Sequence, residues 1–279
     1  MKFLIVLLFS LVSFVPSGAC REDDPGRMTG FANSLYNEGE YYRAVTEYMR
    51  ISSYFPAYRD SFLVRIADCY YKGDQFETAI QKYQRAYVRI QDSVEKDYCV
   101  FQLARCRFQL QETTESLELL SGLVSESAVW SNQAAYYMGY ITAGQFKFNI
   151  SSGWLGKVET AHPWYENAHA LSKDVLQGNR LPQKKPLFAG FLSAVIPGAG
   201  YCYSGHPKIG VASLVLNSLF AYSAYEAFRE DTYVMGSTIT LIGLGWYFGN
   251  IYGSVNKTEQ YNRNVRIQFV KSLDFRYFE

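Results

Sequence analysis

The residue types that most often carry catalysis or bind metals are few and scattered in this chain. Its three histidines, His162, His169 and His206, have no partner at the spacing of a metal site or a catalytic triad. The sequence has no Gly-x-Ser-x-Gly elbow and no His-Glu-x-x-His helix. A catalytic site needs several reactive groups that converge. The sequence therefore predicts a protein that is not an enzyme and has no metal and no cofactor.

Gly198 and Gly200 are the residues that come nearest to a phosphate-binding loop. Such a loop follows a strand and ends in Lys followed by Ser or Thr, and this segment has neither feature. Pro197, directly before them, predicts instead a break between helices. The formal net charge of +1 also argues against a broad basic surface, so we expect no nucleic-acid partner.

The N-terminal residues have the composition of an export signal. Lys2 precedes an uncharged, apolar run over residues 3–15, and small residues follow. Residues 1–19 are therefore predicted to be a signal peptide. Cys20 comes directly after Ala19 and resembles the cysteine of a bacterial lipoprotein box, which leaves two alternatives: a lipid anchor on Cys20, or a plain cleaved signal.

Four further cysteines show none of the short spacings of zinc or redox sites, and we expect them to be buried free thiols. These are Cys69, Cys99, Cys106 and Cys202.

A repeated pattern positions most of the remaining residues. Residues 38–45 and 72–80 share a turn, an aromatic residue and then a helix with alanine on its inner face. Ala44 and Ala79 are 35 residues apart, and each has another alanine twelve residues upstream. Weaker copies align on Ala104 with Ser116 and on Gly139 with Ser151. This pattern resembles the tetratricopeptide repeat, a helix–turn–helix unit of 34 residues with small residues where its helices cross. An irregular helical bundle is the alternative.

The resemblance implies an all-α solenoid over residues 25–178, ending in a capping helix, whose concave side is lined by the first helix of each pair. Polar and aromatic residues on that side would suit an extended peptide or a partner helix. The predicted protein-binding residues are Asn33, Tyr36, Asn37, Asp68, Tyr71, Lys72, Arg105, Gln109 and Tyr140.

Three stretches after a linker at 179–185 contain no Asp, Glu, Lys or Arg: residues 186–205, 209–225 and 232–256. We interpret residues 186–256 as a transmembrane hairpin of two or three segments, followed by a polar tail at 257–279. The pattern Ser-x-x-x-Pro-Gly-x-Gly-x-x-Tyr-x-Gly resembles a module of small bacterial membrane hairpins. Buried helices of a soluble domain are the alternative. The expected turn and packing residues are Pro197, Gly198, Gly200, Gly205, Gly245, Gly249 and Gly253.

Together these patterns predict a membrane-anchored interaction scaffold of the bacterial envelope, with its repeats on the exported, periplasmic side and bound to a segment of another envelope protein. Membrane lipids and a second copy, through the Gly-rich helices, are further expected partners. The alternative hypothesis makes the Gly-rich hairpin the working part, as a small channel, lipid-interacting or transporter-accessory element that the repeats regulate.

Overall fold

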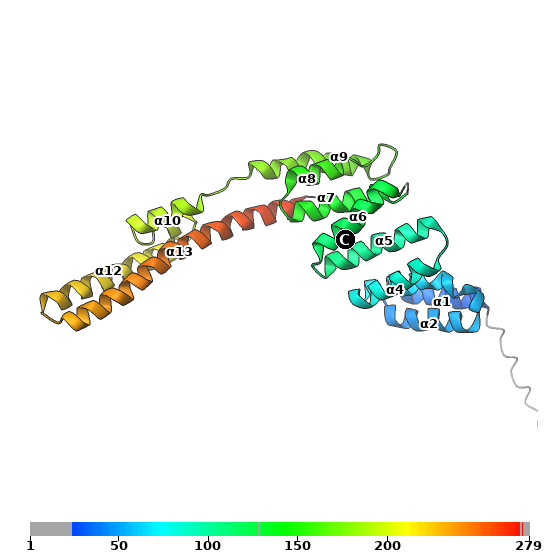
Figure 1. Cartoon of the computed structure of the whole chain (residues 1–279), viewed down its shortest axis with the longest axis horizontal. Coiled ribbons are helices and arrows are strands. Elements are labelled where there is room, and N and C mark those ends of the chain that lie inside the picture. Colours follow the sequence, from blue (N-terminus) through cyan, green and yellow to red (C-terminus); the bar gives the residue numbers. More distant parts are fainter. Residues whose placement is uncertain (1–23, 128, 274, 276–279) are drawn as a thin grey trace, which may run out of the picture. The chain divides into compact units, whose positions relative to one another are not determined.

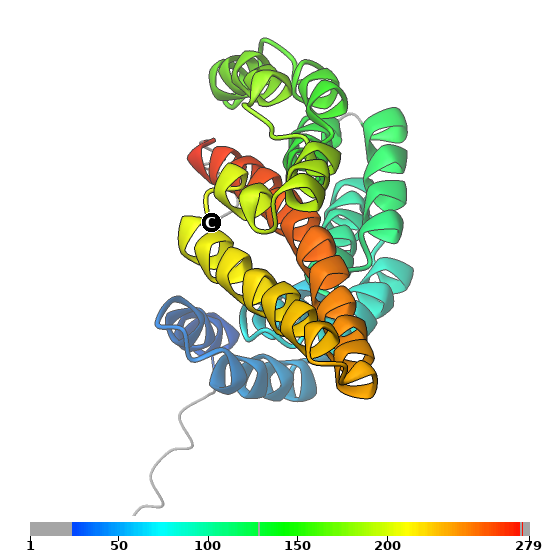
Figure 2. The same ribbon diagram turned by 90° about the vertical axis from the view of Figure 1, so that its left-hand side faces the viewer.

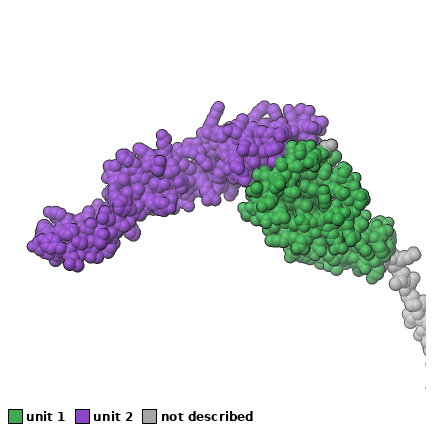
Figure 3. All heavy atoms as spheres, viewed as in Figure 1, with its two compact units in different colours: residues 1–131 green, residues 132–279 purple. Residues whose placement is uncertain are grey.

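The computed structural model describes residues 24–127, 129–273 and 275. The predicted signal peptide and Cys20 lie outside these residues. Every regular element in the described part of the chain is helical. The chain divides into two compact units, residues 1–131 and 132–279, which are described separately (Figure 3).

The first unit is a series of helix pairs in which each helix packs on the next (Figure 1). Its helices are α1 (Pro25–Asn37), α2 (Tyr41–Tyr54), α3 (Leu63–Lys72), α4 (Phe76–Arg89), α5 (Ser93–Gln109) and α6 (Thr113–Glu126), with short 3-10 helices η1 (Pro56–Tyr58) and η2 (Asp60–Phe62) between α2 and α3. The predicted all-helical repeat architecture is confirmed over these pairs.

The same turn joins the two helices of each pair. One residue of the turn has a positive φ angle, and the backbone N–H that follows it donates to a carbonyl five residues earlier. This geometry satisfies carbonyls that the end of a helix leaves free. The positive-φ residues are Gly39, Asp74, Gln111 and, in the second unit, Phe146.

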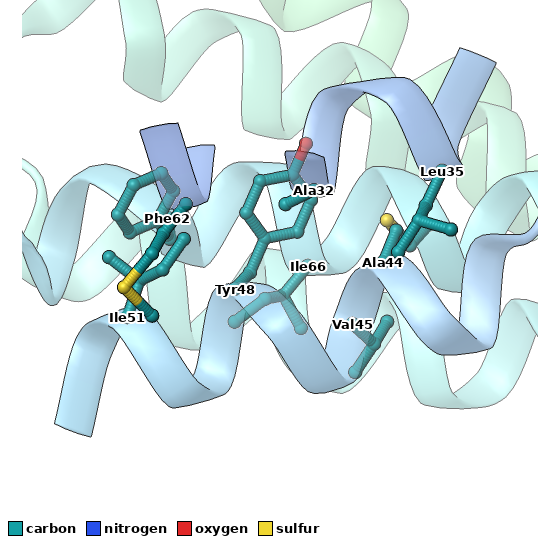
Figure 4. Close-up of a cluster of buried hydrophobic side chains, with 10 residues drawn as sticks. Ala32, Leu35, Ala44, Val45, Tyr48, Ile51, Phe62 and Ile66 are labelled. Atoms are coloured by element: carbon teal, nitrogen blue, oxygen red, sulfur yellow. The ribbon is translucent and has the colours of Figure 1, made fainter. Parts of the chain in front are cut away.

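Small residues let the two helices of a pair approach closely. Ala32 and Ala44 are fully buried between α1 and α2, beside Tyr48 and Ile51 (Figure 4). In the third pair Ser116 takes the alanine position, and its hydroxyl donates to the carbonyl of Ala104 at 2.7 Å. A buried hydroxyl with a backbone acceptor costs little, so the weaker repeats keep the same helix crossing.

The second unit opens with a fourth pair, α7 (Ser131–Gly144) and α8 (Phe148–Leu155), in which Ser151 donates to the carbonyl of Gly139 at 2.7 Å, as Ser116 does to Ala104. The predicted capping helix is α9 (Tyr165–Asp174), which continues as the 3-10 helix η3 (Val175–Arg180). Both α9 and η3 pack on α8.

The remaining helices are α10 (Pro186–Val195), α11 (Ala199–Tyr203), α12 (Pro207–Arg229) and α13 (Tyr233–Ser272). Helices α12 and α13 form a hairpin, and α10 packs on α13 (Figure 2). Two hydrogen bonds of 2.8 Å join the backbone of Lys184 to the side chain of Asn262 and hold the segment before α10 on α13. Helix α13 runs without interruption past residue 257, where a polar tail was expected.

The predicted transmembrane hairpin is wrong. Among the described residues, no helix combines the length and the apolar character needed to cross a membrane. Helices α10 and α11 have 10 and 5 residues, against about 20 for a span. Helices α12 and α13 are long enough, but polar residues such as Asn217 and Asn250 lower their mean hydropathy. These stretches lack charged residues, but their polar side chains keep them from being apolar. The alternatives of two or three membrane crossings therefore no longer apply. The hypothesis of a membrane channel in this hairpin falls with them.

The glycines assigned to membrane packing have two different environments. Gly198 has a φ angle of +91° and begins α11, and a Cβ there would meet the carbonyl of Gly210 on α12. Gly200, at the same junction, lies against the carbonyl of Ala189. Gly205 follows α11 and has a φ angle of +92°. Gly253 lies against the Tyr201 hydroxyl. By contrast, a Cβ at Gly245 or Gly249 would have no described heavy atom within 4 Å outside its own helix.

Candidate functional site

The three predicted binding residues Asn33, Asp68 and Arg105 occupy equivalent positions of α1, α3 and α5. Asn33 is exposed, and its side-chain oxygen accepts a hydrogen bond of 2.6 Å from the Tyr48 hydroxyl. Asp68 is only 7% exposed and accepts the equivalent bond, also 2.6 Å, from Tyr83. The repeat therefore preserves one hydrogen bond while its acceptor changes from an amide to a buried carboxylate.

Asp68 is the electrostatic centre of this face. Its carboxylate accepts a second bond of 2.9 Å from Tyr98, on α5. Burial raises the pKa of Asp68, and the two tyrosine hydroxyls together with Arg65 and Arg105 partly oppose that rise. Burial and the nearby Asp68 charge raise the pKa of Tyr36 to about 12, so this hydroxyl keeps its proton and can donate.

Arg105 and Tyr71 form the next part of the face. The Arg105 guanidinium carbon lies 4.7 Å from the centre of the Tyr71 ring, a cation–π distance. One Arg105 nitrogen, Nη1, donates to Gln102 at 3.3 Å, whereas Nε is buried with no hydrogen-bond partner among the described residues. Burial raises the pKa of Tyr71, and the Arg105 charge and a hydrogen bond with the Gln109 side chain partly oppose that rise. A buried donor without a partner is unfavourable.

These contacts and charge interactions link five of the predicted residues across three successive helix pairs. We call this set the polar–aromatic row: Tyr36, Asp68, Tyr71, Arg105 and Gln109. Asn37 and Lys72 are exposed, at the ends of α1 and α3. Tyr140 belongs to the second unit, where it stacks on Tyr137 at 5.7 Å and contacts Phe275 at 5.2 Å.

Tyr98 and Trp130 were missed by the sequence reasoning. Tyr98 binds Asp68, and its ring lies 5.2 Å from that of Trp130, whose buried Nε1 has no hydrogen-bond partner among the described residues. The repeat alignment begins at Ala104 in the third pair and so passes over the start of α5. The spacing of Tyr98, Gln102 and Arg105, which places them on one face of a helix, is the sequence signal that indicates Tyr98.

The chemistry available on the row is hydrogen bonding and ring contact. The nearby thiols of Cys69, Cys99 and Cys106 are buried as expected, and burial raises the pKa of each to about 12. They remain protonated thiols near neutral pH and are therefore poor nucleophiles. Cys202, in the second unit, is exposed, against expectation.

A cavity of about 420 Å³ lies between α12 and α13 in the second unit. Its lining is mostly apolar and includes Leu214, Phe220 and Leu244, and Tyr247 is the one ionisable side chain among its described lining residues. It offers apolar surface and no acid–base pair.

Comparison with known proteins adds a family for one repeat. Residues 62–88 match the family model of the tetratricopeptide repeat, and this range holds all of α3 and nearly all of α4. The chain is also similar to the crystal structure of a tetratricopeptide repeat protein from Parabacteroides merdae, with 15% identity and a TM-score of 0.43 over 88% of this chain and 97% of that one. No curated protein matches it. Residues 62–88, which carry Asp68 and Tyr71 of the polar–aromatic row, are thus identified as a tetratricopeptide repeat.

Proposed function

We propose that this chain is a non-enzymatic interaction scaffold whose first three helix pairs bind an extended segment of a partner protein along the polar–aromatic row. Stacked helical repeats present extended surfaces of this kind for binding. The observation that carries the proposal is the continuity of the row, because donors, acceptors and aromatic rings lie in register on α1, α3 and α5.

The row also indicates the chemistry of the partner segment. Arg105 has a partly exposed guanidinium and Tyr36 a hydroxyl that stays protonated, so both suit carbonyl or carboxylate oxygens. The Tyr71 ring, which is 9% exposed, lies against the Arg105 guanidinium and helps to position it. An extended segment with free backbone carbonyls and a short acidic or amide side chain fits these groups.

Affinity capture with matched variants tests the proposal. Arg105→Met keeps the length of the side-chain stem but removes the guanidinium, and Tyr71→Ala removes a ring of the row. Tyr54→Ala removes a ring that is 62% exposed on α2, outside the row, and serves as the control. We expect a partner that binds the wild type and the Tyr54 variant to lose about tenfold or more in affinity for the row variants, which is the 1.4 kcal/mol or more expected of a central contact.

The binding constants are measured with the purified partner, after circular dichroism has shown that each variant keeps its helical content. Equal affinity for the Arg105 and Tyr54 variants would contradict the row as the binding site.

The proposed localisation of the repeats is the exported side of the bacterial envelope. Its support is the composition of residues 1–19, with Lys2 before an apolar run and small residues after it. Labelled fatty acid separates the two alternatives for Cys20. Label in the wild type that Cys20→Ser removes would show a lipid anchor, and a processed but unlabelled wild type would show a plain signal.

Self-association through the second unit remains a separate prediction. Gly245 and Gly249 are open on α13, and Leu241, Trp246 and Phe248 are exposed on the same helix. Large exposed apolar patches often mark interaction sites. Sedimentation of the full chain at increasing concentration tests it: a dimer that Gly249→Lys dissociates would support the prediction, and a monomer throughout would exclude it.

A further inference from the structure

A second cavity of the second unit lies where the linker before α10 meets α10 and α13. Its volume of about 880 Å³ is within the usual range for small-molecule sites, about 300–1,000 Å³. Four of its lining side chains are cationic and one is anionic. These are Lys184, Lys185, Arg263 and Arg266, with Glu259. The lining therefore has an excess of positive charge, although the whole chain is nearly neutral.

Two of the four cations are held in place by uncharged groups. The Lys184 ammonium lies 4.0 Å from the centre of the Tyr261 ring, and two hydrogen bonds of 2.8 Å join the backbone of Lys184 to Asn262. Arg266 Nη2 donates to the side chain of Gln183 at 2.9 Å. These contacts fix the linker on α13, so the cavity is preformed. They leave the positive charges without a counter-charge, since a ring and an amide carry no net charge.

The other two cations, Lys185 and Arg263, are exposed at the cavity. In the part of the chain that the structure describes, no ion pair involves any of the four cations or Glu259. Like charges gathered at one cavity repel one another, and an anion that enters relieves the repulsion. The side chains of Lys185 and Arg263 are therefore available to an anionic ligand.

The first turn of α10 also favours an anion. Pro186, Leu187 and Phe188 line the cavity, and no side chain caps this end of the helix. Ala189 donates the first backbone bond of the helix, to Lys185 at 3.2 Å. The N–H groups of Leu187 and Phe188 precede it and have no acceptor within the helix, and phosphates often bind at such ends. The side chains of Leu187 and Phe188 are 85% and 46% exposed, so apolar contact is offered beside the charge.

From these features we propose that the cavity binds a phosphate ester that carries an apolar group. A phosphate monoester has three terminal oxygens and nearly two negative charges. They suit a guanidinium, an ammonium and the helix N–H groups better than the two oxygens and single charge of a carboxylate do. The apolar group lies against Leu187 and Phe188. A soluble ester and the headgroup of a phospholipid share this chemistry. The site is separate from the polar–aromatic row and does not depend on the partner proposed for it.

Calorimetric titration of the full chain with phenyl phosphate at pH 8 tests the site. Benzoate is the matched probe in which a carboxylate replaces the phosphate, and inorganic phosphate is the probe without the apolar group. Arg263→Gln removes a free cation of the cavity. Arg180→Gln removes the same charge from an exposed arginine of η3, in the same unit but outside the cavity, and is the control. All titrations share one ionic strength, because salt screens exposed charges.

We expect the wild type and the Arg180 variant to bind phenyl phosphate at least tenfold more tightly than the Arg263 variant does, as for the loss of one charge-assisted hydrogen bond. The wild type should bind benzoate at least tenfold more weakly than phenyl phosphate, and inorganic phosphate more weakly too. Equal affinity of the two arginine variants for phenyl phosphate would overturn the proposal. Equal affinity of the wild type for benzoate or for inorganic phosphate would also overturn it.

Vesicles distinguish the two sources of the ester. Flotation compares phosphatidylcholine vesicles with and without phosphatidic acid. Binding to the acidic vesicles that Arg263→Gln abolishes and Arg180→Gln keeps would support a lipid headgroup. Binding of phenyl phosphate without binding of vesicles would support a soluble ester. An oligoglutamate peptide tests an acidic protein segment as the occupant. If it displaced phenyl phosphate from the wild type more effectively than inorganic phosphate does, the proposal would be overturned.

Discussion

Tyr83→Phe and Tyr48→Phe remove the same hydroxyl from equivalent positions of two successive repeats. Each hydroxyl donates a bond of 2.6 Å, Tyr83 to the buried Asp68 and Tyr48 to the exposed Asn33. Both tyrosine side chains are fully buried, and phenylalanine keeps the ring in both cases. The pair therefore compares one hydrogen bond with a buried carboxylate against one with a solvated amide.

The expected losses follow from what remains after each substitution. Asp68 keeps the bond from Tyr98 at 2.9 Å but loses its shorter donor in a site that water does not easily reach. A hydrogen bond to a charged group contributes about 1.5–3 kcal/mol, so we expect the Tyr83 variant to lose about 2 kcal/mol of unfolding free energy. Water can replace the donor at the exposed Asn33, and we expect about 0.5–1 kcal/mol for the Tyr48 variant.

Urea unfolding at pH 8 and hydrogen exchange together measure these losses. The first gives the change in the unfolding midpoint, and the second shows whether protection falls in α3 and α4 for the Tyr83 variant and in α1 and α2 for the Tyr48 variant. If the Tyr48 variant lost as much free energy as the Tyr83 variant, the assignment of Asp68 as the electrostatic centre of the face would be refuted.

Four further substitutions test other features of the structure. Burial raises the pKa of Asp68 above its ordinary 3.8, so the folded chain still holds this proton at pH values where the unfolded chain has released it. The contribution of Asp68 to stability therefore falls as pH rises from 3.8 through the folded pKa. Asp68→Asn should flatten that part of the pH profile of unfolding midpoints, and an unchanged slope would contradict this prediction. Gly139→Val should lower the free energy of unfolding by about 1–3 kcal/mol, since a Cβ there would lie 2.6 Å from Leu155. Gly122→Ala, in open space on α6, should raise it by about 0.4–1 kcal/mol. Thermal unfolding measures both changes, and the reverse order would contradict the packing at these glycines. Gly198→Ala should lower the free energy of unfolding by more than about 1 kcal/mol, because residue 198 has a positive φ and a Cβ there would clash with α12. Hydrogen exchange should show reduced protection in α10–α12, and unchanged protection there would contradict the prediction.

The helical repeats could be predicted because their signal is local. The alanines of the first two pairs recur after 35 residues, and each lies where two neighbouring helices touch, so spacing along the chain reports packing directly. The serine of the third pair kept that role through its bond to the Ala104 carbonyl. The membrane prediction failed because it counted only charges, whereas spanning depends on helix length and on every polar side chain along the helix.

The sequence alone therefore determined the helix pairs, their small crossing residues and the helices that carry the candidate face, since all of these depend on neighbours within one repeat. Only the tertiary structure decided which residues of that face interact. Tyr98 meets Asp68 from 30 positions away, and Phe275 reaches Tyr136 from the far end of α13. Such contacts depend on how successive helices pack, and the spacing of residues within one helix does not predict that packing.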